Sequence, residues 1–74
     1  MKSGMLWLDD DKGRSFEEKV RRAVDYYREK YGRVPDRCYV NPRMLGAEFK
    51  VGPVLVQPAD MVLPAHFWIG RESA

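Results

Sequence analysis

Only one segment of this chain, residues 15–32, has the hydrophobic periodicity of an amphipathic α-helix. Its apolar positions recur every three or four residues, at Phe16, Val20, Val24, Tyr27 and Tyr31. Ser15 and Glu18 match a capping box, and Gly32 stands where a helix C-cap is expected. The sequence therefore predicts a helix over about residues 16–31. One such helix can cover only one face of a sheet.

The rest of the chain has the pattern of short strands separated by turn residues. Five apolar runs are bounded by Gly, Pro, Asn or Asp, at residues 5–8, 37–40, 47–51, 54–57 and 66–69. Asn41-Pro42 favours a single turn over residues 43–45, and residues 61–63 are expected to form a covering loop or an edge segment. These elements predict a two-layer α+β fold, with one helix on a mainly antiparallel sheet of four to five strands.

The small size of the chain limits how it can be stabilised. We expect its 74 residues to form one domain, residues 1–74, frayed at about 1–3 and 71–74. Domains of this size often need support from disulfides, metals or oligomerisation. Cys38 is the only cysteine and His66 the only histidine, so a disulfide within the chain is excluded and a zinc site is disfavoured. We therefore expect no cofactor, and oligomerisation is the support that is left.

Side chains alternate across a strand, so each predicted strand contributes to two faces. One set is small and aliphatic apart from Phe67, and it is expected beneath the helix: Leu6, Leu8, Cys38, Val40, Val54, Val56, Phe67 and Ile69. The other set is large and mostly aromatic: Met5, Trp7, Tyr39, Leu55, His66 and Trp68. A large exposed apolar patch usually marks an interaction site. We therefore predict an interaction surface formed by Trp7, Tyr39, Leu55, His66 and Trp68.

Several covers for this second face are consistent with the sequence. The chain can cover itself, since Met44-Leu45 and Met61-Val62-Leu63 are apolar and lie outside the expected strands. A second copy or another protein can cover it, because Trp, Tyr, Met and Arg are enriched in protein interfaces. A small ligand is a further candidate. We predict a non-catalytic interaction module that acts by self-association or by binding a protein partner.

The alternative is a module that binds single-stranded nucleic acid on the same face. Bases would stack on the aromatic residues. The candidate phosphate or rim contacts are Arg37, Arg43, Lys50 and Arg71. The net charge of only +2 and the interleaving of acids with bases, as in Glu17–Arg21 and Glu18–Arg22, argue against this alternative.

A thiol-dependent enzyme is the third and least favoured class. It would need an imidazole within reach of the Cys38 thiol and a carboxylate such as Asp36 or Asp60 behind the imidazole. The alternation places Cys38 and His66 on opposite faces, so we predict that the protein is not an enzyme. Asp9-Asp10-Asp11 lacks the spacing of a calcium loop and is interpreted as a solvated turn.

The beginning of the sequence gives no sign of targeting or membrane insertion. The apolar run before Asp9 spans only residues 5–8, whereas a signal peptide needs an apolar stretch of about 7–15 residues and a membrane helix about 20. We therefore expect a cytoplasmic protein with no membrane partner.

Overall fold

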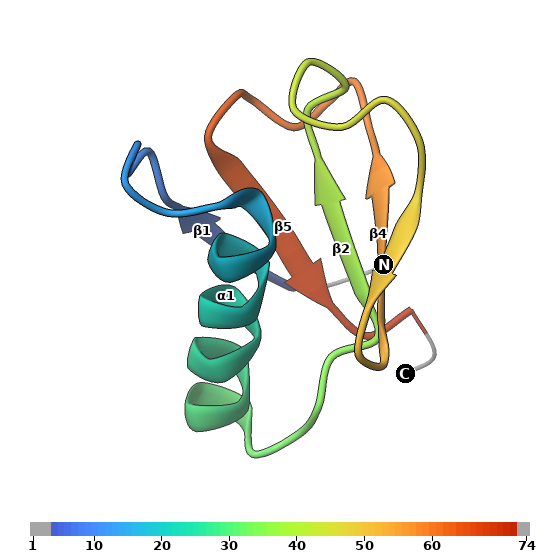
Figure 1. The fold of residues 1–74 in the computed structure, drawn as a ribbon. Coiled ribbons are helices and arrows are strands. Elements are labelled where there is room, and N and C mark those ends of the chain that lie inside the picture. Colours follow the sequence, from blue (N-terminus) through green and yellow to red (C-terminus); the bar gives the residue numbers. More distant parts are fainter. Residues whose placement is uncertain (1–3, 73–74) are drawn as a thin grey trace.

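A computed structural model describes residues 4–72 as one helix packed on a five-stranded sheet (Figure 1). The elements are β1 (Gly4–Leu8), α1 (Phe16–Tyr31), β2 (Arg37–Val40), β3 (Phe49–Val51), β4 (Val54–Pro58) and β5 (His66–Gly70). The predicted α+β fold is confirmed. The bounds of α1 and β2 agree with the predicted ones, and the other strands differ from them by one or two residues.

The sheet has the strand order β1-β5-β2-β4-β3 and is mostly antiparallel. β5 pairs antiparallel with both β1 and β2, so β1 and β2 run in the same direction with β5 between them. β2 and β4 form one parallel pair, and β3 pairs antiparallel with β4. The path from β1 through α1 to β2 is thus a parallel crossover, which places α1 against one face of the sheet (Figure 1).

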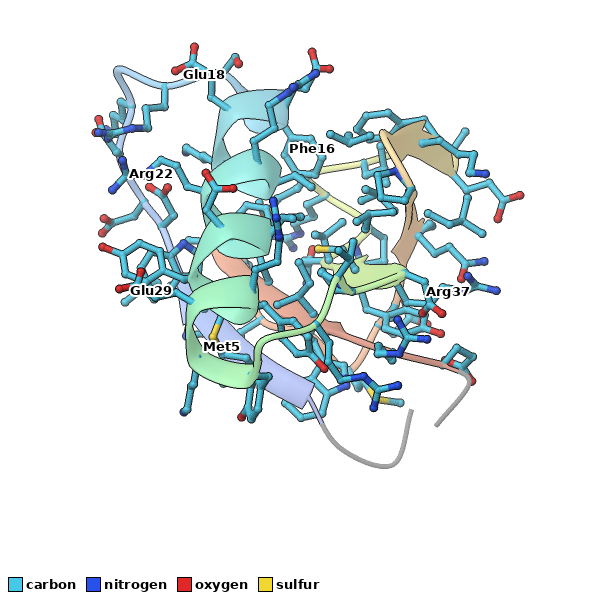
Figure 2. The ribbon with its side chains drawn as sticks, turned by 90° about the horizontal axis from the view of Figure 1, so that it is seen from below. Met5, Phe16, Glu18, Arg22, Glu29 and Arg37 are labelled. Carbon is cyan, nitrogen blue, oxygen red and sulfur yellow. The ribbon has the colours of Figure 1, made fainter. Side chains whose placement is uncertain are left out.

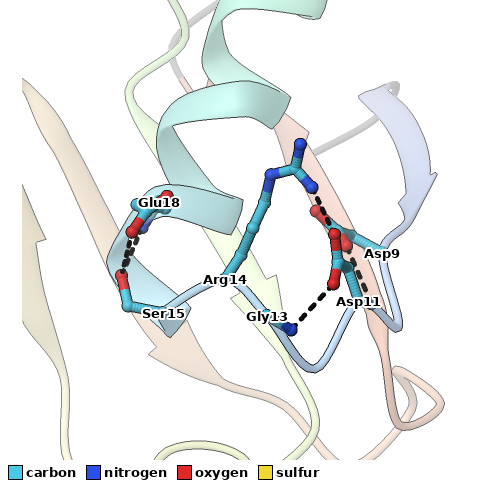
Figure 3. Close-up of polar contacts among 6 residues, drawn as sticks. All are labelled: Asp9, Asp11, Gly13, Arg14, Ser15 and Glu18. Carbon is cyan, nitrogen blue, oxygen red and sulfur yellow. Dashed lines mark hydrogen bonds and ion pairs between the residues drawn. The ribbon is translucent and has the colours of Figure 1, made fainter.

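Local capping fixes both ends of α1. The Glu18 backbone N–H donates to Ser15 Oγ at 3.2 Å, as the capping box predicts (Figure 3). The Glu18 carboxylate departs from the ideal motif, because it accepts from the Ser15 hydroxyl at 3.4 Å. At the other end Gly32 adopts φ +68° and donates its N–H to the Arg28 carbonyl, a left-handed conformation that glycine adopts without strain.

Replacing the N-cap tests how much this contact contributes. Ser15→Ala removes the side-chain acceptor of the Glu18 N–H and should lower the free energy of unfolding by about 1 kcal/mol. Urea denaturation followed by circular dichroism measures the change. Ser15→Thr keeps the hydroxyl and should stay close to the wild type. Equal losses in the two variants would contradict the capping role.

The acidic segment before α1 forms a turn that is stabilised by its own side chains (Figure 3). Asp9 Oδ1 accepts the Asp11 N–H at 3.1 Å, and Asp11 Oδ1 accepts the Gly13 N–H at 2.8 Å. Asp11 also forms an ion pair with Arg14. The Gly13 N–H and the Arg14 guanidinium lower the pKa of the Asp11 carboxyl. Asp9 and Asp11 therefore act as turn-forming groups. Asp10 and Asp11 are exposed, as expected of a solvated turn, whereas Asp9 is buried.

The core lies between α1 and one face of the sheet. Residues paired across neighbouring strands share a face, so the register assigns each side chain to a side. The Phe67 ring lies 5.7 Å from the ring of Phe16 on α1, which identifies the helix-covered face. The buried residues of this core are Val20, Ala23, Tyr27, Cys38, Val40, Val51, Val54, Val56, Phe67 and Ile69.

The predicted orientation of β1 is wrong. Trp7 pairs with Phe67 and Met5 with Ile69, so Met5 and Trp7 face α1. The Trp7 ring stacks on Tyr26 of α1 with centroids 4.2 Å apart. Leu6 and Leu8, which were expected beneath the helix, point to the other side of the sheet and are 59% and 57% exposed.

Part of the expected C-terminal fraying falls on residues that are anchored. The Arg71 guanidinium donates to the Val34 carbonyl at 2.8 Å, and the Glu72 N–H donates to Asp36 Oδ1 at 2.8 Å. Residues 1–3 and 73–74 lie outside the described part of the chain. Within residues 4–72, α1 is neither long nor apolar enough to cross a membrane, and it is the only helix.

Candidate protein interface on the open sheet face

The side of the sheet opposite α1, called here the open face, carries rows of side chains fixed by the register. One row runs Leu6, Trp68, Tyr39, Gln57 across β1, β5, β2 and β4. The next row contains Arg37, Leu55 and Lys50, and a third pairs Leu8 with His66. Figure 2 shows Met5 beside α1 and Arg37 on the far side of β2 from the helix.

Four of the five predicted interaction residues share this open face. Tyr39, Leu55, His66 and Trp68 all lie there and are half-buried. Trp7 does not join them, because it lies on the helix side in contact with Tyr26. Leu6 and Leu8 occupy the places expected for Trp7 and Met5, so the open face is less aromatic and more aliphatic than predicted.

An exposed apolar patch lies at the β1–β5 end of the open face. It consists of Leu6, Leu8, Met61, Leu63 and Trp68 and is called the apolar patch below. Met61 is 88% exposed and Leu63 is 66% exposed. A groove of about 280 Å³ is lined by Leu6, Met61, Val62, Leu63, His66 and Trp68. A second groove of about 290 Å³ continues it toward Tyr39 and Ala59, with Met61, Val62 and Trp68 in common.

Hydrogen bonds fix the loop that carries Met61 and Leu63. The Val62 carbonyl accepts from the Asn41 side-chain amide at 2.8 Å, and the Val62 N–H donates to the Ala59 carbonyl. The His66 N–H donates to the Leu63 carbonyl at 3.1 Å. Val62 is thereby buried, whereas its two neighbours point outward. Of the predicted self-covering segment 61–63, only Val62 is buried.

The end of this loop is held in an unusual backbone conformation. Ala65 has φ +65°, a region that residues with a Cβ rarely adopt. Its N–H donates to the Met44 sulfur at 3.1 Å, and its carbonyl accepts the Asp9 N–H at 2.9 Å. Met44 and Leu45, the other predicted cover, pack against the core. The two hydrogen bonds of Ala65 thus hold the end of the loop between Met44 and Asp9.

The other end of the open face is polar. The Tyr39 hydroxyl donates to a Glu72 carboxylate oxygen at 2.9 Å, and the Gln57 amide donates to Glu48 at 2.9 Å. Partial burial and the Glu72 carboxylate raise the pKa of Tyr39, while the Tyr39 hydrogen bond lowers the pKa of Glu72. Both effects stabilise a neutral phenol beside a charged carboxylate. The open face therefore divides into an apolar end and a polar end.

The structure does not gather the four predicted phosphate or rim contacts into one cluster. Arg37 and Lys50 lie on the open face with Leu55 between them, and Arg37 donates to the Asp36 carbonyl. Arg43 lies in the turn after β2, and Arg71 is held by the Val34 carbonyl. The basic groups are thus spread over different parts of the domain.

The residues of the imagined thiol triad do not meet. Cys38 pairs with Ile69 and is fully buried on the helix-covered face, whereas His66 pairs with Leu8 on the open face. The His66 Nδ1 lies 2.9 Å from the Pro64 carbonyl, to which it donates. Burial raises the pKa of the Cys38 thiol to about 12. Across residues 4–72, no group of three metal-ligating side chains is brought together.

Sequence reasoning missed the aliphatic members of the apolar patch. In β1 all residues from Met5 to Leu8 are apolar, so the alternation carries no information on which face is buried. The one sequence feature that could have indicated the buried side of β1 is Tyr26. It lies at the boundary of the apolar stripe of α1, and its ring covers Trp7. No sequence signal shows that Met61 and Leu63 point away from the sheet.

Comparison of the chain with protein-family models, with curated proteins and with solved structures found no significant match.

Proposed function

We propose that this chain is a non-catalytic interaction module that self-associates through the apolar patch. The observation that carries the proposal is the exposure of four large aliphatic side chains, Leu6, Leu8, Met61 and Leu63, beside Trp68 on one side of the domain. Single exposed apolar residues are ordinary, but a contiguous group around grooves is typical of a binding surface.

The absence of charge favours a second copy as the occupant of the patch. The patch contains no charged side chain, so two identical copies can meet there without placing like charges together. The polar end of the open face supplies the hydrophilic rim that such interfaces usually have.

Binding of single-stranded nucleic acid has less support as the function. The Glu72 carboxylate lies against Tyr39, one of the rings on which a base would stack. Arg37 and Lys50 lie at the polar end, and Arg43 and Arg71 lie elsewhere. Phosphate binding would favour a cluster of one sign of charge, which these positions do not form.

The proposal includes a cytoplasmic location. The one cysteine of the chain is buried as a free thiol, in keeping with a reducing compartment.

Sedimentation tests the proposal. The wild type should shift from monomer toward dimer as its concentration rises from about 5 µM to about 1 mM, the range of weak dimers. Leu8→Ser combined with Leu63→Ser removes two exposed aliphatic side chains and should raise the dissociation constant about tenfold or more.

The matched control changes two apolar residues that lie outside the patch. Tyr31 and Val34 are 46% and 41% exposed at the end of α1 and just after it, and Tyr31→Ser with Val34→Ser should leave the dissociation constant within about threefold. A wild type that stays monomeric over the whole range, or equal effects of the two double variants, would overturn the proposal.

A further inference from the structure

The two edges of the sheet differ in how well they are protected against pairing with another strand. β1 and β3 are the edge strands. β3 has only three residues, one of which is Lys50, and Pro53 follows in the turn. β1 has five residues, Gly-Met-Leu-Trp-Leu, with neither a charge nor a proline. Proteins usually block open edges with charges, prolines or short strands, so β3 is protected and β1 is not.

The hydrogen-bond pattern identifies which backbone groups of β1 face outward. The Asp9 N–H donates to the Ala65 carbonyl, continuing the β1–β5 register by one residue. Bonded and non-bonded pairs alternate along an antiparallel ladder, so Met5 and Trp7 also bond to β5. The N–H and C=O groups of Gly4, Leu6 and Leu8 therefore point to the outer side, where the described residues place no further strand.

These outward groups are self-complementary. When a second β1 runs antiparallel about a two-fold axis at Leu6, Leu6 lies opposite Leu6 of the second copy and Gly4 lies opposite Leu8. This register pairs all five residues of β1, and every outward N–H meets a C=O of the other strand. Gly4, which has no side chain, leaves room beside Leu8 on the open face.

Pairing at this edge also brings the apolar patch of one copy next to the apolar patch of the other. Tyr39 pairs with Trp68 and Trp68 with Leu6 in each copy. Across the two-fold axis the row becomes Tyr39, Trp68, Leu6 followed by the same three residues of the second copy in reverse order. On the helix side Met5 of one copy lies opposite Trp7 of the other, a favourable thioether–aromatic arrangement.

We infer that two copies of this chain associate by antiparallel pairing of their β1 edges, which forms one continuous ten-stranded sheet. The inference rests on the proposed self-association and specifies its geometry. A five-residue edge with flanking side chains is a small contact compared with the standard 800 Å² per partner, so the dimer belongs to the weak, reversible class.

Proline at an outward position tests this geometry. Leu6→Pro removes an N–H that does not bond to β5, and proline is tolerated on the solvent side of an edge strand. Leu6→Val keeps that N–H and an apolar, strand-favouring side chain. In sedimentation experiments we expect Leu6→Pro to raise the dissociation constant about tenfold or more and Leu6→Val to change it by less than about threefold.

Amide hydrogen exchange in the wild type is a second test of edge pairing and needs no variant. The amides of Gly4, Leu6 and Leu8 should exchange quickly in dilute solution and become protected as the protein concentration rises. Met5 and Trp7, which bond to β5 in the monomer, serve as internal controls and should be protected at all concentrations.

The outcomes separate this inference from the proposed function. If the wild type self-associates, but Leu6→Pro and Leu6→Val behave alike and the three outward amides gain no protection, edge pairing is overturned and self-association stands. A wild type that is monomeric throughout overturns both. If Leu6→Pro fails to fold, as judged by circular dichroism, hydrogen exchange is the deciding test. Protection of the Gly4, Leu6 and Leu8 amides that rises with concentration supports edge pairing, and its absence overturns it.

Discussion

Phe67→Ala should lower the free energy of unfolding by about 3–5 kcal/mol, the largest effect we expect from a single substitution. Phe67 is fully buried in β5, where it pairs with Trp7 on one side and Val40 on the other. Its ring also contacts Phe16 of α1, with centroids 5.7 Å apart. Removal of the ring takes contacts from both layers and leaves a cavity at the centre of the core.

The expected loss from Phe67→Ala is a large fraction of the total free energy of unfolding of a chain of this length. At roughly 0.05–0.15 kcal/mol per residue, 74 residues correspond to about 4–11 kcal/mol. Thermal and urea unfolding should show a melting temperature lower by at least about 12 °C. Met61→Ala is the control, because Met61 is 88% exposed, and it should change stability by less than about 0.5 kcal/mol. Similar losses in the two variants would mean that Phe67 is not central to the core.

Alkylation of Cys38 should be about a thousandfold slower in the folded protein than in the unfolded chain. The thiolate is the reacting species, and burial raises the pKa of Cys38 from 9.0 to about 12. At neutral pH the higher pKa lowers the thiolate fraction by about 10³, and burial also blocks the reagent. Mass spectrometry after timed iodoacetamide treatment, with and without urea, measures the ratio. If the alkylation rates of the folded and unfolded protein were within tenfold of each other, the thiol would be accessible and reactive, and a thiol-dependent enzyme would become the better hypothesis.

The same pKa shift makes stability depend on pH at the alkaline end. The pKa of the folded state lies above the unfolded value, so the folded state keeps its proton longer. The contribution of the neutral buried thiol is fully present below about pH 9 and is lost as the pH rises toward 12. Cys38→Ala should remove this part of the alkaline dependence.

The sequence predicted well wherever local chemistry decides the structure. The bounds of α1 follow from the spacing of its apolar residues, the Ser15 cap and the left-handed Gly32, all of which act within a few residues of one another. The faces of β2, β4 and β5 were also predicted correctly, because Cys38, Val40, Val54, Val56, Phe67 and Ile69 are the buried members. Four of the five predicted interaction residues consequently share the open face.

The sequence by itself determined one helix, four to five strands and a sheet with one face that the helix cannot cover, because periodicity, capping and turn residues are local properties. Only the tertiary structure decided which side of β1 is buried. Met5, Leu6, Trp7 and Leu8 are all apolar, so either orientation satisfies the alternation, and the choice depends on packing of Trp7 against Phe67 and Tyr26. The outward direction of Met61 and Leu63 likewise depends on a hydrogen bond from a distant residue, Asn41, whose side-chain amide donates to the Val62 carbonyl between them. The location of the apolar patch, at the unprotected edge of the sheet, follows from these long-range contacts.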